Sequence, residues 1–383
     1  IIGKQVFIYS TKEGKRTRYD GSTTLSYSDF EENYTFPEKF FSNEVAVTTQ
    51  EAYERDTSYW QTTRTAELSK EESRMIYVRD SIKAIVTSQE YQDSVTAKYN
   101  KISFLEVAWD GVGFRNNRKK SHLYVGSLPE LISFSVVGGF RVGPNLSYNR
   151  LFESGRRINL RTDFSYGFLN QDIQGSAGGW LRYDPFRLGD VWMDIGRSFQ
   201  SINPFDAYLN QLKASNYILA DAVNIGHRIE IVNGLYWRVT ANRTTRRSLD
   251  GFKTSSFLED IVEDEGEPID FEPYETFITS NAISYRPGQR YMREPNRKVL
   301  LGSKWPTFTF THRKGWKGVL SSDVDFDFLE FSVNHNVILG ALGNSRYQFQ
   351  IGQFVNTKEL QFIDLKRFRQ SDPFLYSDPL NTF

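Results

Sequence analysis

Residues 156–168 read Arg-Arg-Ile-Asn-Leu-Arg-Thr-Asp-Phe-Ser-Tyr-Gly-Phe, and the two sets of alternate side chains differ in polarity. The mainly apolar set is Ile158, Leu160, Thr162, Phe164, Tyr166 and Phe168, and the polar set is Asn159, Arg161, Asp163, Ser165 and Gly167. Because a strand points successive side chains to opposite faces, the stretch predicts one long strand between an apolar and a watery environment. About ten residues is the length that a tilted strand needs to cross a bilayer. The pattern recurs along the chain, so the sequence predicts an all-β fold, a transmembrane antiparallel outer-membrane β-barrel.

The composition agrees with this fold class. With 383 residues, the chain is long enough for a large barrel and a small extra domain. Aromatic residues make up 15% of the chain, which suits the aromatic girdles of such barrels. The mean hydropathy of −0.51 also fits, because every second residue of a barrel strand faces a polar lumen. No apolar run approaches the 18 residues of a membrane-spanning helix.

Charge and cysteine content exclude several classes of function. Lys plus Arg and Asp plus Glu balance at 47 each, which argues against a nucleic-acid partner. The chain has no Cys, so disulfides, thiolate metal sites and Cys nucleophiles are absent. The chain begins Ile1-Ile2-Gly3 without Met or a signal peptide. An exported protein needs such a signal, so we expect that this sequence is either processed or lacks its N-terminus.

Three regions follow one another along the chain. Residues 1–50 alternate weakly and predict a small periplasmic β segment. Residues 51–100 predict a helical connector, because Ser69 precedes two acidic residues and apolar residues then recur at helical spacing. A second short helix is expected over residues 90–100. From residue 101 to residue 383 the β pattern predicts the barrel, incomplete at the C-terminus because Pro379 interrupts the last segment.

The connections between the expected strands alternate in length. Short turns are expected near 153–157, 185–189, 232–234 and 339–343, and longer connections near 200–225 and 243–273. Because outer-membrane barrels have short periplasmic turns and long outer loops, the 243–273 loop is assigned to the outside. We expect about eleven strands, to be completed to an even number in a closed barrel. A change in the parity of apolar residues after Asp327 predicts a bulge.

Histidines and acidic residues offer few candidate sites. The four histidines, His122, His227, His312 and His335, are scattered and lack the spacing of metal ligands. Asp323, Asp325 and Asp327 share one strand face and could form an acidic patch in a pore. The favoured interpretation is a lumen neutralised by arginines such as Arg161, Arg182 and Arg238. The acidic run at 259–267 lacks the pattern of a calcium loop and is interpreted as a solvated charge block.

Basic and aromatic residues also have two interpretations. Residues 116–120, Asn-Asn-Arg-Lys-Lys, could contact lipid phosphates, but an ordinary polar turn is favoured. Several tryptophans could stack on sugars, although their positions near expected strand ends favour anchoring at the membrane interface. They are Trp180, Trp192, Trp237, Trp305 and Trp316. The glycine pairs at 138–139 and 178–179 are interpreted as strand glycines that ease curvature or the close approach of another backbone. The sequence predicts no catalytic, cofactor-binding or metal site.

A resemblance adds to this interpretation. The matching stretches lie at 36–41, 56–60, 68–72, 79–81, 99–101, 285–289, 295–297 and 378–383. In their order and spacing they resemble a large outer-membrane family of Bacteroidota-type bacteria. In that family, a domain of unknown function, a carboxypeptidase-regulatory-like β-sandwich precedes a connector and a C-terminal β-barrel. The resemblance implies that this sandwich lies upstream of residue 1 and that further barrel follows residue 383. It implies no catalytic residues.

These observations favour a non-enzymatic barrel in the bacterial cell outer membrane. We expect it to act as a scaffold or accessory subunit of a larger assembly for protein insertion, export or import. Its expected partners are outer-membrane lipid and other outer-membrane or periplasmic proteins, with no cofactor and no nucleic acid. The alternative is a pore or ligand transporter for small solutes, which an open, polar lumen would favour. A barrel enzyme would need a Ser, His and Asp cluster at one rim, and a soluble sugar-binding β protein would stay monodisperse without detergent.

Overall fold

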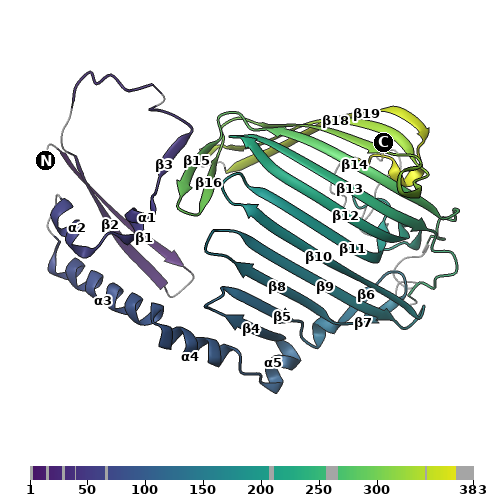
Figure 1. Ribbon diagram of the computed structural model, residues 1–383, viewed down its shortest axis with the longest axis horizontal. Coiled ribbons are helices and arrows are strands. Elements are labelled where there is room, and N and C mark those ends of the chain that lie inside the picture. Colours follow the sequence, from purple (N-terminus) through teal and green to yellow (C-terminus); the bar gives the residue numbers. More distant parts are fainter. Residues whose placement is uncertain are drawn as a thin grey trace. The chain divides into compact units, whose positions relative to one another are not determined.

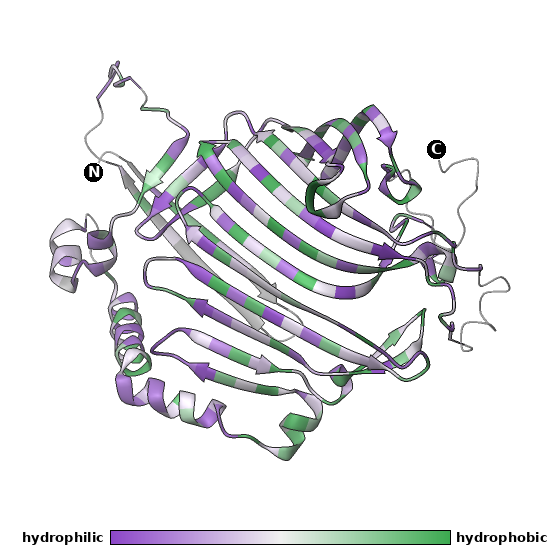
Figure 2. Cartoon of the chain, turned by 45° about the vertical axis from the view of Figure 1, so that its right-hand side comes forward, coloured by the Kyte–Doolittle hydropathy of each residue, from purple (hydrophilic) through white to green (hydrophobic). Residues whose placement is uncertain are grey.

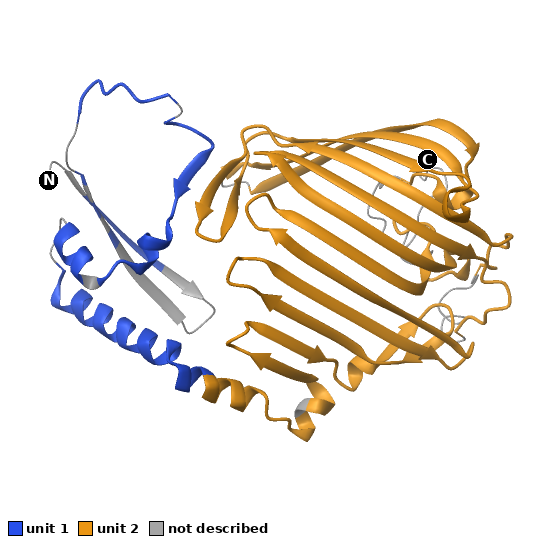
Figure 3. Ribbon diagram, in the orientation of Figure 1, with its two compact units in different colours: residues 1–92 blue, residues 93–383 orange. Residues whose placement is uncertain are grey.

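The computed structural model describes residues 3–13, 17–27, 31–38, 40–64, 68–206, 211–255, 266–340 and 343–367. Contacts divide the chain into two compact units, residues 1–92 and residues 93–383 (Figure 3). The described chain is mostly β, and its α-helices all lie between residues 50 and 109. None of the helices in these residues combines the length and the hydropathy that a membrane-spanning helix needs.

The first unit contains strands and helices in that order. Its strands are β1 (Gly3–Glu13), β2 (Thr17–Tyr27) and β3 (Glu44–Val47). Its helices are α1 (Gln50–Glu54), α2 (Thr57–Thr63) and α3 (Lys70–Thr87). The next helix, α4 (Gln89–Tyr99), begins in the first unit and ends in the second. Ser69 begins α3 with a capping box, in which its hydroxyl accepts from the Glu72 amide and its own amide donates to the Glu72 carboxylate. The predicted helix start at Ser69 is therefore confirmed. The domain boundaries at 50 and 100 stay a prediction.

One large antiparallel sheet forms the second unit. After α5 (Phe104–Trp109), which the sequence did not predict, its strands are β4 (Val112–Asn116), β5 (Ser121–Val125), β6 (Ile132–Ser135), β7 (Gly139–Val142), β8 (Asn145–Leu151), β9 (Arg157–Gly167), β10 (Asp172–Asp184), β11 (Gly189–Ser201), β12 (Tyr217–Val232), β13 (Leu235–Arg247), β14 (Tyr274–Tyr285), β17 (Thr307–Gly315), β18 (Asp325–Ile338) and β19 (Asn344–Glu359). These are fourteen strands in the described residues, against about eleven expected. β15 (Arg290–Glu294) and β16 (Arg297–Gly302) form a separate hairpin.

The sheet runs from β4 at one edge to β19 at the other, and neighbours in sequence are mostly neighbours in space (Figure 1). The β6–β7 hairpin joins it through pairing of β7 with β9. In the part of the chain that the structure describes, the edge strands β4 and β19 do not pair with each other. The predicted antiparallel β fold is therefore confirmed, whereas closure into a barrel stays a prediction.

The two faces of the sheet differ in polarity. Register places Leu160 opposite Gly179, Gly179 opposite Met193, and Met193 opposite Ile225, so apolar positions line up across strands. We call this side the apolar face; its members include Phe114, Leu123, Leu160, Phe164, Met193, Ile195, Ile225, Ile283, Phe310, Phe331 and Ile351. Met193 is 48% exposed and Ile225 is 51% exposed. The opposite side, called the polar face, carries the side chains that alternate with those of the apolar face. Figure 2 shows this alternation as stripes along the strands.

The two ends of the sheet differ in their connections. Connections 152–156, 185–188 and 233–234 all lie at one end, here called the short-turn end. Connections 202–216 and 248–273 lie at the other, the long-loop end. The predicted alternation of short and long connections is thus confirmed for these five connections. It does not hold for the β9–β10 connection 168–171, which is short but lies at the long-loop end, and residues 217–225, which were expected in a long connection, belong to β12. The connection between β14 and β17 lies at the short-turn end but is long, because it contains the β15–β16 hairpin.

Polarity inverts at the long-loop end of β18. There Val324 and Phe326 are completely buried on the polar-face side, where they form a core with Tyr274 and Ile278. Leu360 and Ile363, from the segment after β19, pack against this core. The parity change therefore has two causes. The pairing of β18 with β19 does shift in register near Asp327, as a bulge requires, but β18 pairs with β17 without interruption while its buried side changes.

The glycine pair at 138–139 corrects another prediction. Gly138 and Gly139 have φ of 84° and 63°. Gly138 ends the short connection 136–138 of the β6–β7 hairpin, and Gly139 is the first residue of β7. Residues other than glycine rarely adopt a positive φ, so glycine suits this turn. The interpretation as strand glycines is therefore wrong for Gly138, because alternation around the pair looked continuous in sequence, and is confirmed for Gly139, which pairs with Ser135 in the ladder.

Candidate functional site

A cavity of about 570 Å³ opens on the polar face toward the short-turn end. Strands β8 to β13 contribute its walls. We call it the Arg–Trp pocket, and its lining is Asn149, Arg157, Asn159, Arg161, Gly178, Gly179, Trp180, Asp190, Trp192, Asp194, Arg228 and Arg238. Small-molecule sites have volumes of roughly 300–1,000 Å³, so the pocket is of the right size for one ligand.

Two glycines leave room for side chains that line the pocket. A Cβ on Gly226 would lie 2.1 Å from Cζ2 of Trp192, and a Cβ on Gly178 would lie 2.2 Å from Oδ1 of Asp194. Both separations are far below van der Waals contact. The missing side chains therefore leave room for Trp192 beside β12 and for Asp194 beside β10.

Arginines and aspartates make the pocket strongly charged. Asp190 is only 1% exposed and accepts from Arg182 Nε at 2.8 Å, from Arg182 Nη2 at 3.2 Å, and from Arg228. Arg161 Nη2 lies 3.0 Å from Oδ1 of Asp194. The lining holds four arginines and two aspartates, so it has an excess of two positive charges.

Two tryptophans flank these charges. Trp180 and Trp192 are direct cross-strand partners on the polar face. The guanidinium carbon of Arg182 lies 5.3 Å from the ring centroid of Trp180, and that of Arg238 lies 4.9 Å from the Trp192 ring, both within cation–π range. The interpretation as interface anchors is therefore wrong for these two residues. Trp237, in contrast, lies on the apolar face and is partly exposed.

The pocket was missed from sequence because its residues come from six strands. Asp190, Trp192 and Asp194 alternate with Val191, Met193 and Ile195, and only the apolar set of β11 was used in the prediction. The polar set of β11, two aspartates on either side of a tryptophan, was the sequence signal that could have indicated the pocket. Arg161, Arg182 and Arg238 were expected as lumen arginines, and all three do lie on the polar face at or beside the pocket.

The predicted acidic triplet lies elsewhere. Asp327 accepts from Lys314 Nζ at 2.8 Å and contacts His312 Nε2 at 2.8 Å, while Asp325 accepts from Asn356 at 2.7 Å. Asp323 precedes β18 and accepts the amide of Glu275 at 2.8 Å. Register puts Asp327 on the same side as Phe331, the apolar-face side, at the long-loop end. The favoured neutralisation by polar-face arginines is therefore wrong: Lys314 of β17 pairs with Asp327, and Asn356 of β19 donates a hydrogen bond to Asp325.

The four histidines lie apart, as their spacing in sequence indicated. Each contacts a different side chain at 2.7–2.8 Å: His122 with Tyr99, His227 with Tyr183, His312 with Asp327, and His335 with Tyr347. His335 also contacts the carbonyl oxygen of Lys304 at 3.1 Å. Within the described ranges, no three His, Asp or Glu side chains gather as metal ligands would. Most of the acidic run at 259–267 falls outside the described residues, which omit 256–265.

The basic stretch at 116–120 forms a turn. Asn116 accepts the amide of Lys119 at 2.9 Å, and Arg118 pairs with Asp93 at 2.7 Å. The hydrogen bond to Asp93 raises the pKa of Arg118 above its usual range. The favoured interpretation as a polar turn is confirmed in its geometry.

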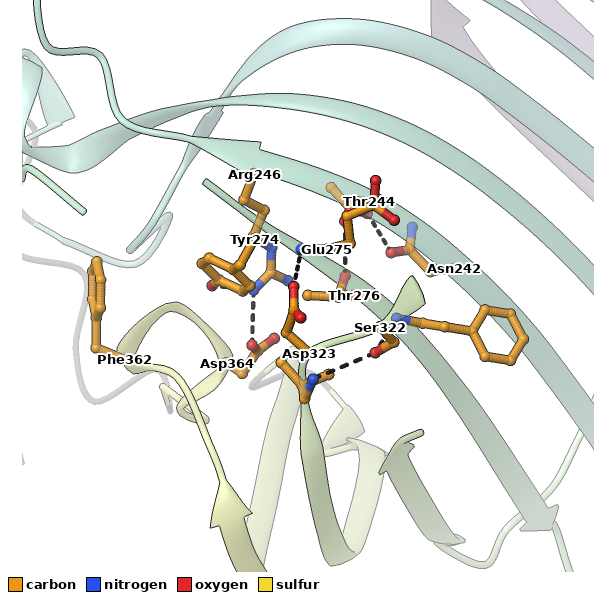
Figure 4. Close-up of polar contacts among 12 residues, drawn as sticks. Asn242, Thr244, Arg246, Tyr274, Glu275, Thr276, Ser322, Asp323, Phe362 and Asp364 are labelled. Atoms are coloured by element: carbon orange, nitrogen blue, oxygen red, sulfur yellow. Dashed lines mark hydrogen bonds and ion pairs between the residues drawn. The ribbon is translucent and has the colours of Figure 1, made fainter. Parts of the chain in front are cut away.

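A buried ion cluster fixes the polar face at the long-loop end (Figure 4). Asp364 is completely buried and lies between Arg246 Nη1 at 2.8 Å and Arg313 Nη2 at 3.1 Å. Arg246 Nη1 also donates to the Tyr274 hydroxyl at 2.9 Å. The cluster ties the segment after β19 to β13 and β17, so it covers that part of the polar face.

A second buried cluster lies at the short-turn end. Glu230 pairs with Lys298 of β16 and accepts from Gln289 Nε2 at 2.8 Å and from the Gly234 amide at 2.9 Å. It fastens the β15–β16 hairpin to the β12–β13 turn. Because its donors and acceptors satisfy one another, we assign it a structural role.

Of three comparisons with known proteins, one gives a match, and it lies within the second unit. No curated protein and no solved structure matches the chain. The model of the C-terminal domain of a family of unknown function, DUF5686, matches residues 105–383. This match covers well over half of the 383 residues, so the chain belongs to the DUF5686 family.

Proposed function

We propose that the sheet is part of the wall of a β-barrel in the bacterial outer membrane. The chain would act there without catalysis, as a scaffold or accessory subunit of a larger assembly for protein insertion, export or import. A carboxypeptidase-regulatory-like domain upstream, membership of a Bacteroidota-type family, and partners among outer-membrane lipids and proteins belong to the same proposal. The observation that carries it is the continuous, half-exposed apolar face.

Strand length supports a membrane position for this face. β9 to β14 have 11 to 16 residues each, and a tilted strand needs about 9–11 to cross a bilayer. Soluble proteins rarely expose contiguous apolar patches beyond a few hundred Å². Lipid would cover this face without any hydrogen-bond cost, because the strands pair with one another across the sheet.

The margins of the apolar face support the same position. At the short-turn end it carries the pairs Tyr183–His227 and His335–Tyr347, polar aromatic groups that suit a membrane interface. At the long-loop end the same side becomes charged. Asp221 there accepts from Arg197 at 2.6 Å and also pairs with Arg247. An apolar band between aromatic and charged margins is typical of outer-membrane strands.

A scaffold role is favoured over a pore by the covered polar face. The segment after β19 packs onto that face at the long-loop end through Leu360, Ile363 and Asp364. Solutes would need an open path there. The Arg–Trp pocket supports the alternative, a pore or ligand transporter, because it leaves a charged space at the short-turn end.

The first unit, taken by itself, offers surfaces for protein partners. Phe36 packs against Phe40 and Phe41 with ring centroids 4.7 and 4.9 Å apart, yet Phe41 is 80% exposed. Met75 and Tyr77 of α3 are also largely exposed. Aromatic residues and Met are enriched at protein interfaces, so this unit suits an accessory subunit.

A matched pair of substitutions on β12 tests the membrane position. Ile225→Arg places a charge on the apolar face and should destabilise the protein in lipid vesicles by roughly 2–4 kcal/mol. Asn224→Arg, one residue away on the polar face and opposite Asp194, should change stability by no more than about 0.5 kcal/mol, as for an ordinary surface position. Equal, small effects of the two variants in urea unfolding would contradict the membrane wall.

A mild-detergent pull-down of the full-length protein from native membranes tests the scaffold role. A stoichiometric set of outer-membrane partners is expected. If the protein instead purifies alone, the scaffold role is contradicted, and single-channel conductance then tests the pore.

A further inference from the structure

We propose that the Arg–Trp pocket binds an anionic saccharide, a sugar that carries a phosphate or carboxylate group. The proposal goes beyond the scaffold role, because the pocket is complete within β8 to β13 and needs no partner chain. Three features of the pocket carry it: free positive charge, flat aromatic surface, and amide and carboxylate groups that match hydroxyls.

The positive charge is available to a ligand. Asp190 is saturated by Arg182 and Arg228. Among the described residues, Arg157 and Arg238 have no carboxylate within ion-pair distance, so their charges are not neutralised within the pocket. Guanidinium groups bind phosphate and carboxylate groups through paired hydrogen bonds, which favours an anionic ligand.

The aromatic residues are held in place before any ligand arrives. Trp192 lies in the space left by Gly226, and Arg238 stacks on its ring. Trp180 lies directly opposite on β10. The C–H groups on one side of a sugar ring make a flat apolar surface, and indole rings pack against such surfaces with little loss of side-chain entropy.

Polar groups that suit hydroxyls complete the lining. Asn159 and Asn149 both line the cavity, and Asn159 donates to Asn149, a bond that uses only one donor and one acceptor position of the two amides. Asp194 keeps acceptor capacity beside its contact with Arg161. A cavity of about 570 Å³ is much larger than one phosphate ion, so a sugar fills it better than a free inorganic anion.

Calorimetric titration of the full chain in detergent micelles tests the ligand class. The probes are glucose 6-phosphate, galacturonate, glucose and inorganic phosphate. We expect both acidic sugars to bind, and glucose and phosphate to bind at least about tenfold more weakly, because each lacks one set of contacts. Equal binding of phosphate and glucose 6-phosphate would overturn the saccharide, and equal binding of glucose would overturn the anionic group. Absence of binding by both acidic sugars would overturn the site.

Variants locate the binding within the pocket. Arg157→Gln and Arg238→Gln should each weaken glucose 6-phosphate binding about tenfold, because each removes a charged hydrogen-bond donor. Arg346→Gln is the matched control, since Arg346 lies on the polar-face side of β19 outside the pocket lining. Near-ultraviolet circular dichroism verifies that each variant keeps its fold. An equal loss in all three variants, or in none, would contradict the proposal. These results do not depend on co-purifying partners, so they stand apart from the test of the scaffold role.

Discussion

Asp364→Asn should be among the most destabilising isosteric substitutions in the second unit. The carboxylate is 0% exposed, and it lies between two arginines whose side chains are 10% and 26% exposed. Removing one partner of a buried ion pair costs about 3–5 kcal/mol, because the remaining charge stays buried without compensation. Here two guanidinium groups, those of Arg246 and Arg313, lose their common counter-ion.

Two contacts moderate the expected loss. Arg246 keeps its hydrogen bond to the Tyr274 hydroxyl, and Arg313 keeps the backbone carbonyl of residue 364 at 3.2 Å. We therefore expect a decrease of about 3 kcal/mol in the free energy of unfolding, the lower end of the range for broken buried pairs. The assay is urea unfolding of the full chain in detergent micelles, followed by tryptophan fluorescence.

A partly exposed ion pair provides the control. Asp194 pairs with Arg161, whose side chain is 69% exposed, so Asp194→Asn should cost less than about 1 kcal/mol. If Asp364→Asn is as mild as this control, the ion cluster does not hold the segment after β19, and the reasoning from burial is refuted.

Three further outcomes are expected. Gly226→Ala should destabilise by about 1–3 kcal/mol and alter the near-ultraviolet circular dichroism of Trp192, because its Cβ would overlap the indole; an unchanged spectrum would contradict this packing. Lys298→Met leaves Glu230 buried without a cation, so amides of the β15–β16 hairpin should exchange with solvent faster, whereas unchanged protection would show that the cluster does not fasten it. The pKa of the exposed Asp56 carboxyl is held below its usual range, mainly because it accepts an amide of α2, so its stabilisation of α2 is complete above the usual carboxyl pKa and fades as pH falls through the lowered value. Amide chemical shifts of α2 should follow that titration, and in Asp56→Asn they should not.

The sequence predicted what depends on local period. Alternation in 156–168 identified β9 because strand periodicity acts within a few residues, and Ser69 identified the start of α3 because capping is equally local. The lengths of connections separated the two ends of the sheet for the same reason. Each of these predictions needed only neighbouring residues.

The Arg–Trp pocket could not be predicted in this way. Its members become neighbours only through register, as when Asp190 of β11 meets Arg228 of β12. The inversion of polarity at Phe326 depends on a segment near residue 363 that folds back onto the sheet. Alternation reveals that a strand has two faces, but the environment of each face is set by distant parts of the chain.

The triad of Arg182, Asp190 and Arg228 also bears on how the sheet aligns during folding. A slip of one residue between strands exchanges the two faces, so it is unfavourable because apolar side chains would move to the polar face. A slip of two residues restores the faces and is invisible to that pattern. It would, however, move Asp190 along its strand by roughly 6.6 Å from both arginines, which are its direct cross-strand partners. A single carboxylate thereby favours one register among three neighbouring strands. A slip of two residues, which apolar contacts would tolerate, leaves three charged groups without their partners.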